Sequence, residues 1–234
     1  MPRPPIRAIA VVVPIRDEEA LLERCILGIE GAAAWLADRV APEVRVVPVL
    51  ALDSCQDGSG AIAERSSAEV LEIEVGNVGL ARAAGVLRGL ALLEAVPREE
   101  IWIANTDADS FVPRDWLAQQ LALADAGWDV VLGRVQPDLA DLPEELHGSA
   151  AAAVVRTGEP IYGANLGVRA SSYVAAGGFP AAREHEDQRL VAALRRAGAR
   201  VTASIATPVL TSGRVEGRTP GGYAGYLRDA LAGA

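Results

Sequence analysis

Two carboxylates stand one residue apart at the end of an apolar run. The stretch IWIANTDADS, residues 101–110, reads as a buried strand that leads into Asp107 and Asp109. Carboxylate oxygens are hard ligands that suit Mg²⁺ or Mn²⁺. A divalent ion held there would offset the charge of a diphosphate in a chain whose net charge is −9. The same pair also fits an ordinary turn, because aspartate side chains bond to nearby backbone after strands.

Polar residues follow three other strand-like runs in the first half of the chain. They are Pro14 and Asp17 after the first run, Asp53 after the second and Asn77 after the third. In an open parallel sheet, ligands bind at the carboxyl ends of the strands, so these residues would lie together. With Asp107 they predict a polar ligand site along one edge of a sheet.

The segments that must position these residues alternate between strand and helix patterns. The alternation predicts an α/β fold with a mostly parallel, Rossmann-like sheet flanked by helices. The first run, AIAVVVP, is apolar throughout, which is typical of a strand covered on both faces. We expect strands at Ala8–Val13, Val44–Leu52, Glu69–Val75, Ile101–Asn105 and Val130–Leu132.

Two helices have clear signals in the sequence. Residues 18–36 carry apolar side chains at helical spacing, and Asp17 stands where an N-cap would be. Residues 187–197 carry a second apolar face, with arginines near its end and Gly198 as the stop.

The composition bounds the class of protein. The chain has 234 residues, of which 50% are hydrophobic and 23% charged, which is enough apolar material for one packed domain. It contains no lysine, and its negative net charge argues against a nucleic-acid partner. An anionic ligand would therefore be met by arginines, helix N-termini or a metal ion.

Cysteine usage and hydropathy bear on the compartment. Cys25 and Cys55 form no CxxC pair, which disfavours a zinc site or a disulfide framework and favours a reduced, cytoplasmic protein. No apolar run approaches the roughly 20 residues that cross a bilayer, so we expect no integral membrane segment. The N-terminal residues lack the apolar region of a secretory signal.

Six segments, in their order and spacing, resemble the inverting glycosyltransferases of family 2, which have the GT-A fold. They span residues 11–201, and together they are far more specific than any one of them. The expected organisation is a single domain over 1–234, with a nucleotide-binding half (8–110), a donor-sugar and acceptor half (111–205) and a C-terminal lid or tail (206–234). The segments are VVVPIRDEEALLERCI, LDSCQDGSG, NVGLARAAGV, NTDADSFVP, YGANLGVRASSYVAAGGFP and EHEDQRLVAALRRAGARV.

In the first half, the resemblance implies a nucleotide pocket beside a metal site. Asp107 and Asp109 match the motif that binds the sugar nucleotide and a metal ion, Mn²⁺ or Mg²⁺. Pro14 and Asp17 match the start of the nucleotide pocket, and Asp53 matches an acid that bonds the base. The alternative for Asp53 is a plain turn acid.

Further matches concern the nucleotide and the donor sugar. Asn77, Gly79 and Arg82 match the segment that closes over the nucleotide, where Arg82 would reach the base or ribose. Asn165 lies in the segment that matches the floor of the donor-sugar site. The alternatives are a plain turn before a helix for Asn77 and Gly79, and a buried strand with a glycine-rich turn around Asn165.

The late acidic pair of the family matches Glu186 and Asp187, and its second member is the catalytic base. An inverting transfer needs one carboxylate within hydrogen-bond reach of the acceptor hydroxyl, and such a base contributes about 10² to 10⁴ in rate. Asp187 also fits a first-turn acid that is stabilised by the helix dipole, and the two roles are compatible. We expect Glu184 and Glu186 to be solvated.

The glycine-rich stretch TSGRVEGRTPGGYAGYL carries Arg214 and Arg218. Arginine forks suit phosphate oxygens, so we interpret this stretch as a lid over the diphosphate, with a plain surface tail as the alternative. In some enzymes of the fold a histidine completes the metal site, and His147 and His185 are the two histidines of this chain.

The implied reaction is a single in-line displacement at the anomeric carbon of a nucleotide-diphosphate sugar. Asp187 would take the proton of the acceptor hydroxyl. Ile15 and Ala83 depart from the family pattern, in which an aromatic and an asparagine are common. Because the membrane helices and QxxRW signature of processive relatives are absent, we expect a small or carrier-linked acceptor. The few aromatic residues near expected ligand positions are Trp116, Tyr162, Phe179 and Tyr223.

Other classes of protein explain fewer of these sequence motifs. A nucleotidyltransferase of related fold, or a dinucleotide-binding oxidoreductase, would have a glycine-rich loop after the first strand, where this chain has PIRDEEA. A phosphohydrolase would place its acid pair after the first strand rather than the fourth. A non-catalytic relative that binds sugar nucleotides remains an alternative because of Ile15 and Ala83.

Overall fold

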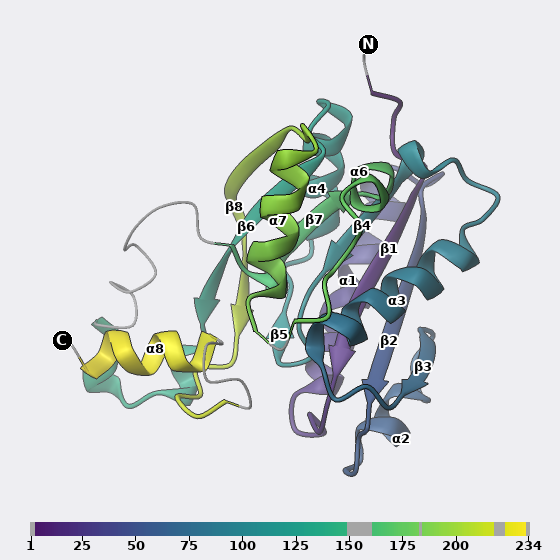
Figure 1. Ribbon diagram of the computed structural model, residues 1–234. Helices are drawn as coiled ribbons and strands as arrows, with labels where there is room; N and C mark the ends of the chain where they lie inside the picture. Colours follow the sequence, from purple (N-terminus) through teal and green to yellow (C-terminus); the bar gives the residue numbers. More distant parts are fainter. Residues whose placement is uncertain (1–2, 149–160, 183, 218–222, 233–234) are drawn as a thin grey trace.

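The computed structural model of the protein describes residues 3–148, 161–182, 184–217 and 223–232 (Figure 1). The strands are β1 (Ala8–Ile15), β2 (Arg45–Asp53), β3 (Glu69–Ile73), β4 (Ile101–Asn105), β5 (Ser110–Phe111), β6 (Val130–Pro137), β7 (Leu166–Arg169) and β8 (Val201–Thr211). They form one eight-stranded sheet in the order β3-β2-β1-β4-β7-β6-β8-β5. Only the pairs that involve β7 and β5 are antiparallel among these strands, so the expected mostly parallel sheet is confirmed.

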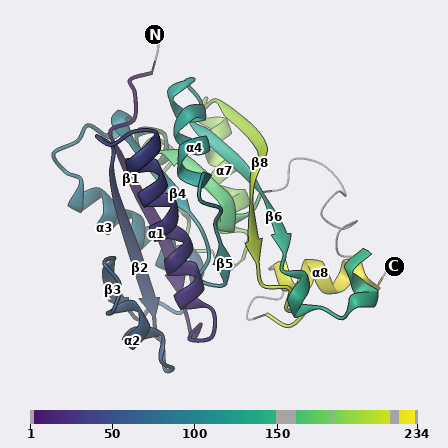
Figure 2. The ribbon, with the colours of Figure 1, turned by 180° about the vertical axis from the view of Figure 1, so that it is seen from behind.

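Helices cover both faces of the sheet. Those of the described residues are α1 (Leu22–Arg39), α2 (Ser59–Ala63), α3 (Val78–Leu92), α4 (Trp116–Asp125), α6 (Ala170–Ala175), α7 (Glu186–Arg196) and α8 (Tyr223–Ala232). Short 3₁₀ turns occupy Arg98–Glu100, Leu139–Asp141, Glu144–Leu146 and Gly163–Asn165. Helices α3, α6 and α7 lie on the face seen in Figure 1, and α1 and α4 lie on the face seen in Figure 2.

Strand β1 lies in the middle of the core. Its alternate side chains Ile9, Val11 and Val13 pack with α1 and α4 on one face. Ala10 and Val12, which point the other way, pack with α3, α6 and α7. Burial on both faces explains why the sequence of this strand is apolar without alternation.

Two features differ from the sequence-based expectation. Helix α1 begins at Leu22 with Leu21 at the N-cap position, so Asp17, whose backbone is left-handed with φ 50°, lies before the helix and does not cap it. Strand β8 continues to Thr211, so the boundary expected at 206 falls inside a strand. Helix α8 packs through Leu227 against Leu142, which lies after β6.

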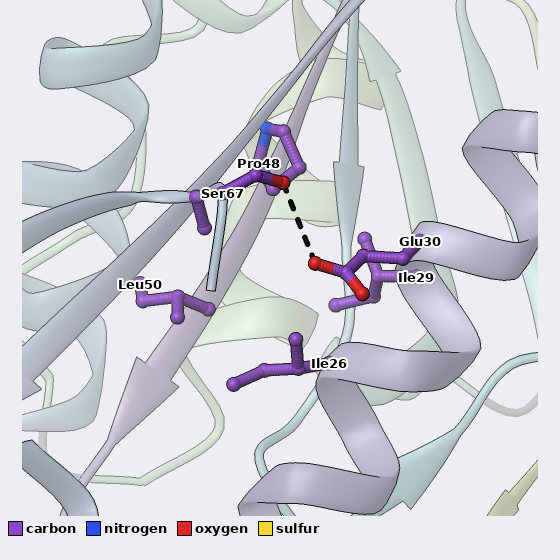
Figure 3. A pocket seen from close by; sticks show the side chains of 7 residues that line it. Ile26, Ile29, Glu30, Pro48, Leu50 and Ser67 are labelled. Carbon is purple, nitrogen blue, oxygen red and sulfur yellow. Dashed lines mark hydrogen bonds between the residues drawn. The ribbon is translucent and has the colours of Figure 1, made fainter. Parts of the chain in front are cut away.

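Two hollows lie away from the acidic edge of the sheet. A cavity of about 10 Å³ between α1 and β2 is lined by Ile26, Leu50 and Glu30, whose carboxylate accepts a 3.4 Å bond from Ser67 (Figure 3). This volume is about what one water needs, so the cavity is too small for a substrate. A groove of about 590 Å³ between α3 and α6 is mostly apolar. In the described part of the chain, no helix has the length and apolarity to span a membrane.

Candidate active site

Five segments of the chain meet at one edge of the sheet, the lower edge in Figure 1. Strands β1, β2 and β4 are parallel and all end there. Strand β7 starts from the same edge, because Asn105 at the end of β4 pairs with Leu166. Strand β8 ends at this edge, since Thr211 pairs with Ser110. The loops at this edge carry most of the candidate site residues.

Asp109 is the more buried carboxylate of the pair after β4. Thr211 Oγ1 donates to its Oδ1 at 3.2 Å, and Arg214 Nη2 lies 2.8 Å from its Oδ2. Burial, and next the negative charge of Asp107, raise the pKa of Asp109 to about 6, although Arg214 acts in the opposite direction. A divalent cation bound beside Asp109 would offset the negative charge that disfavours ionisation of this carboxyl. These oxygen donors therefore fit Mn²⁺ or Mg²⁺.

Asp107 is tied to a buried arginine. Arg82 Nη2 donates to Asp107 Oδ1, and Arg82 Nε donates to Glu186 Oε1 at 3.2 Å. Arg82 is 2% exposed and Glu186 6%. The expectation that Glu186 is solvated is wrong, because its carboxylate is the buried partner of this guanidinium. Burial raises the pKa of Glu186, and the charge of Arg82 opposes that shift.

Asp187 lies in the first turn of α7, next to this ion pair. Its Oδ2 accepts from the backbone N–H of Gly163 at 2.8 Å, and its Oδ1 accepts from that of Gln188 at 2.7 Å. The carbonyl of Gly163 in turn accepts from Arg82 Nη1 at 3.3 Å. Asp187 is thus connected to Asp107 through Gly163 and Arg82. A Cβ on Gly163 would lie 2.5 Å from Arg82 Nη2, so a larger residue there would displace the guanidinium.

Asp53 holds the loop between β3 and α3. Its carboxylate accepts from the backbone N–H groups of Val75 at 2.8 Å and of Gly76 and Asn77 at 2.9 Å. Burial alone would raise the pKa of Asp53, but the three backbone donors lower it. Asn77 is the N-cap of α3, because its Oδ1 accepts from Leu80 N at 3.0 Å.

Pro14, Asp17 and Gly79 lie around the same end of the sheet. Pro14 is the last but one residue of β1, and Asp17 accepts from the backbone N–H of Gln56 at 2.7 Å. Gly79 lies against the segment before α7, where a Cβ would come within 2.6 Å of Pro180 O. Each is close to the acidic edge, and Asp17 and Gly79 have contacts that shape its loops.

Glu18 is a site residue that the sequence reasoning missed. It is 7% exposed, and its two oxygens accept from Arg214 at 2.7 and 3.0 Å. The expected helix start at residue 18 concealed this role, and an acid beside Asp17 was the one available signal. Arg214 therefore contacts both Glu18 and Asp109 at the end of β8.

Other candidates have different surroundings. The Asn165 amide donates to Arg134 O at 2.8 Å and Thr207 O at 3.0 Å, and accepts from Trp116 Nε1 at 2.9 Å. Asn165 and Trp116 are both buried, and their side chains connect β6, β8 and α4. Arg218 lies outside the described residues.

Both histidines, and one group of two aspartates and a cysteine, also bear on where a metal ion could bind. His185 is exposed at the start of α7, and His147 Nε2 lies 3.0 Å from a backbone carbonyl. Ligand atoms of Asp17, Cys55 and Asp57 lie within 4.8 Å of one another. Because Asp57 Oδ2 accepts from a backbone N–H at 2.9 Å, as Asp17 does from another, this group interlocks two loops.

Solved structures of similar fold share little sequence with this chain. S. aureus TarS (1–349) in complex with UDP-GlcNAc has a TM-score of 0.64 and 17% identity, over 91% of this chain and 60% of that chain. Mannosyltransferase PcManGT from Pyrobaculum calidifontis in complex with GDP-Man and Mn²⁺ has a TM-score of 0.62 and 20% identity, over 93% and 59%. Glucosyl-3-phosphoglycerate synthase from Mycobacterium tuberculosis in complex with Mg²⁺ and UDP has a TM-score of 0.53 and 16% identity, over 84% and 68%.

The fold and the acid-lined edge together define an α/β domain of the GT-A type. Residues 10–166 match the model of Glycosyl transferase family 2, and the chain belongs to that family. The resemblance that the sequence motifs indicate is thus confirmed. The chain spans less than two thirds of the length of the TarS and PcManGT chains. A comparison with curated proteins finds no match.

Proposed function

We propose that this chain transfers a sugar from a nucleotide-diphosphate sugar to a hydroxyl of a small or carrier-linked acceptor, with inversion by a single displacement. The observation that carries the proposal is the link from Asp107 through Arg82 and Gly163 to Asp187. It brings the acid motif after β4 and the acid at the start of α7 to one edge. Membership of family 2 and the nucleotide sugars bound by TarS and PcManGT support the donor class.

In this proposal the nucleotide lies over the ends of β1 and β2. Asp53, which is 3% exposed and accepts from Ser54 and three backbone N–H groups, acts in this proposal by fixing the loop that leads into α3 beside the base. Pro14, Asp17 and the turn at Asn77 and Gly79 border this end. Stacking on the base does not come from Ile15, which is 1% exposed and packed in the core.

Asp107 and Asp109 would hold Mn²⁺ or Mg²⁺, which supplies charge stabilisation for the departing diphosphate. PcManGT was solved with Mn²⁺ and glucosyl-3-phosphoglycerate synthase with Mg²⁺, which supports a divalent ion here. Arg214, beside Asp109, adds a guanidinium fork for phosphate oxygens. Arg82 is buried between two acids, so in this proposal it orients Asp107 and does not contact the base.

Asp187 acts as the general base in this proposal. Its carboxylate is half-buried, and the N–H groups of Gly163 and Gln188 fix its orientation. It takes the proton from the acceptor hydroxyl as the oxygen attacks the anomeric carbon from the face opposite the diphosphate. One backside attack inverts the configuration at that carbon.

A second candidate is a non-catalytic module that binds sugar nucleotides. It is favoured by one observation, that Asp107 and Asp109 are each already paired with an arginine. The experiment is to incubate the purified chain with Mn²⁺, a panel of nucleotide sugars and hydroxyl acceptors, and to measure nucleotide release together with thermal shift. Metal-dependent release that requires an acceptor supports the transferase. Stabilisation by UDP or GDP without release across the panel supports the binding module.

A further inference from the structure

Glu18 and Asp109 share the guanidinium of Arg214. Arg214 Nη2 lies 2.7 Å from Glu18 Oε1 and 2.8 Å from Asp109 Oδ2, and Nη1 lies 3.0 Å from Glu18 Oε2. Arg214 thus makes two bonds to Glu18 and one to Asp109. The Glu18 backbone N–H donates to Ser59 Oγ at 2.9 Å, which anchors this side of the bridge. The arginine comes from the segment after β8, so the bridge joins residues that are 196 positions apart.

The contact with Asp109 uses an oxygen that a divalent cation would need. The Oδ1 atom of Asp109 already accepts from Thr211, and Oδ2 is the oxygen beside Arg214. A divalent ion bound to Oδ2 would stand next to Arg214 Nη2, which lies 2.8 Å from that oxygen, and two cations so close together repel each other. The ion and the guanidinium therefore compete for Oδ2 of Asp109.

We infer that Arg214 is an exchangeable counter-cation of Asp109, and that Glu18 is a positioning residue that keeps Arg214 at the site when a divalent ion replaces it. The inference rests on the proposed function, because the ion is the one that accompanies the donor diphosphate. The two bonds to Glu18 persist when the single bond to Asp109 is lost. The guanidinium then remains beside the ion, where it meets phosphate oxygens of the donor.

The exchange predicts opposite effects on two affinities when Arg214 is changed. In Arg214→Gln, the affinity for Mn²⁺ alone rises about tenfold, because the competing cation is gone. In the same variant, the affinity for UDP or GDP at saturating Mn²⁺ falls about tenfold, because the guanidinium that donates hydrogen bonds to the phosphate oxygens is gone. A purely structural role of Arg214 would lower both affinities together.

The first measurement is a titration of the full chain with Mn²⁺, in which free Mn²⁺ is followed by electron paramagnetic resonance. The matched control is Arg88→Gln. It removes a positive charge from the exposed ion pair between Arg88 on α3 and Glu69 on β3. Its Mn²⁺ affinity should equal that of the wild type. Arg214→Lys keeps the competing charge but lacks the fork, so its Mn²⁺ affinity should stay near that of the wild type while its affinity for UDP or GDP falls.

The role of Glu18 is tested with a variant that keeps its charge. Glu18→Asp shortens the side chain by one methylene and loses contact with the guanidinium. Arg214 then stays on Asp109, so the Mn²⁺ affinity falls severalfold, and the nucleotide affinity falls with it. If only the charge of Glu18 mattered, Glu18→Asp would bind Mn²⁺ as the wild type does, and that result would remove Glu18 as a positioning residue.

The outcomes separate this inference from the proposed function. A wild type that binds Mn²⁺, with an Arg214→Gln variant of equal or lower Mn²⁺ affinity, overturns the inference and leaves the proposed function intact. A wild type that binds UDP but no Mn²⁺ overturns the metal part of the proposed function and the exchange together. Thermal unfolding of each variant verifies that it is folded, and Arg214→Lys decides the result if Arg214→Gln does not fold.

Discussion

Arg82 Nε lies 3.2 Å from Glu186 Oε1, although the two residues are 104 positions apart in the sequence. Both side chains are less than 10% exposed, and the same guanidinium also donates to Asp107. One buried cation therefore connects the loop after β4 with the start of α7. Because Asp187 follows Glu186 directly, this contact sets the position of the proposed base relative to the acid motif.

Loss of the buried cation should destabilise the protein strongly. Arg82→Met leaves Glu186 buried without a partner, and removal of one member of a buried pair costs about 3 to 5 kcal/mol. We expect a loss near the lower figure, because Asp107, the second partner, has a side chain that is 35% exposed. Urea unfolding gives the free energy of unfolding for the variant and the wild type.

The exposed pair of Arg88 and Glu69 provides the control for this change. Arg88→Gln should cost less than about 1 kcal/mol, as is typical of solvated ion pairs. The double variant Arg82→Met with Glu186→Gln should lose less stability than Arg82→Met alone, since no buried charge is then left unpaired. Equal losses in the Arg82 and Arg88 variants would contradict the buried role of Arg82.

Replacement of the proposed base should separate chemistry from binding. Asp187→Asn keeps the shape of the side chain and removes its ability to take a proton, so sugar transfer should fall by about 10² to 10⁴. The affinity for UDP or GDP with Mn²⁺ should stay at the wild-type value. Initial rates of nucleotide release and isothermal titration measure the two quantities. Glu23→Gln, another first-turn helix acid, is the control and should retain full activity. Near-normal turnover of Asp187→Asn would eliminate this residue as the base.

Lowering the pH should reduce the stability of the wild type more than that of a variant without the Asp53 carboxylate. The folded protein lowers the pKa of Asp53 below its ordinary value, through the N–H groups of the loop before α3. Such an acid contributes stability above its unfolded pKa of about 3.9, and this contribution is lost as pH falls through the lower folded value. Asp53→Asn should therefore be less stable at neutral pH and should show a shallower loss of stability below about pH 4.

Urea unfolding at a series of pH values measures this slope for both proteins. Asp38→Asn changes an exposed side chain on α1 and should leave the stability curve in place. Parallel curves for Asp53→Asn and the wild type would show that the loop before α3 does not depend on the charged carboxylate.

The parts of the fold that the sequence predicted are those set by local pattern. Strand β4 has the bounds Ile101–Asn105 that were expected from an apolar run followed by turn residues. Strand β1 was recognisable because both of its faces are buried. Strand β7 has only four residues, and β8 is partly exposed along its length, so neither gave a strong pattern.

The parts that the sequence missed depend on partners far along the chain. The Asp17 carboxylate bonds to the backbone of Gln56, 39 positions away, and no local pattern indicates that contact. Glu186 was expected to be solvated because no local signal indicates its pairing with Arg82. Asn165 is fixed by Trp116, 49 positions earlier, so its burial could not be inferred from the neighbouring glycines. The acids themselves were identifiable, but their pairing with arginines required the tertiary structure.

One substitution made at two glycines should have opposite effects. A Cβ at Gly79 would lie 2.6 Å from Pro180 O and 3.0 Å from Ala182 O. Both are backbone oxygens, which cannot move away as easily as the end of a flexible side chain. Gly79→Ala should cost about 1 to 3 kcal/mol, the usual cost of overpacking. It should also slow nucleotide release, because the displaced segment leads into α7 and carries Asp187 with it.

Gly31, in the middle of α1, is the matched control, because a Cβ added there would meet no neighbouring atom within 4 Å. Gly31→Ala should stabilise the protein by about 0.5 to 1 kcal/mol, because alanine loses less backbone entropy than glycine in a helix. For a chain of this size, 1 kcal/mol shifts Tm by about 2 to 4 °C, so calorimetry resolves both changes. If Gly79→Ala raised Tm as Gly31→Ala is expected to do, α3 would not be packed closely against the segment before α7.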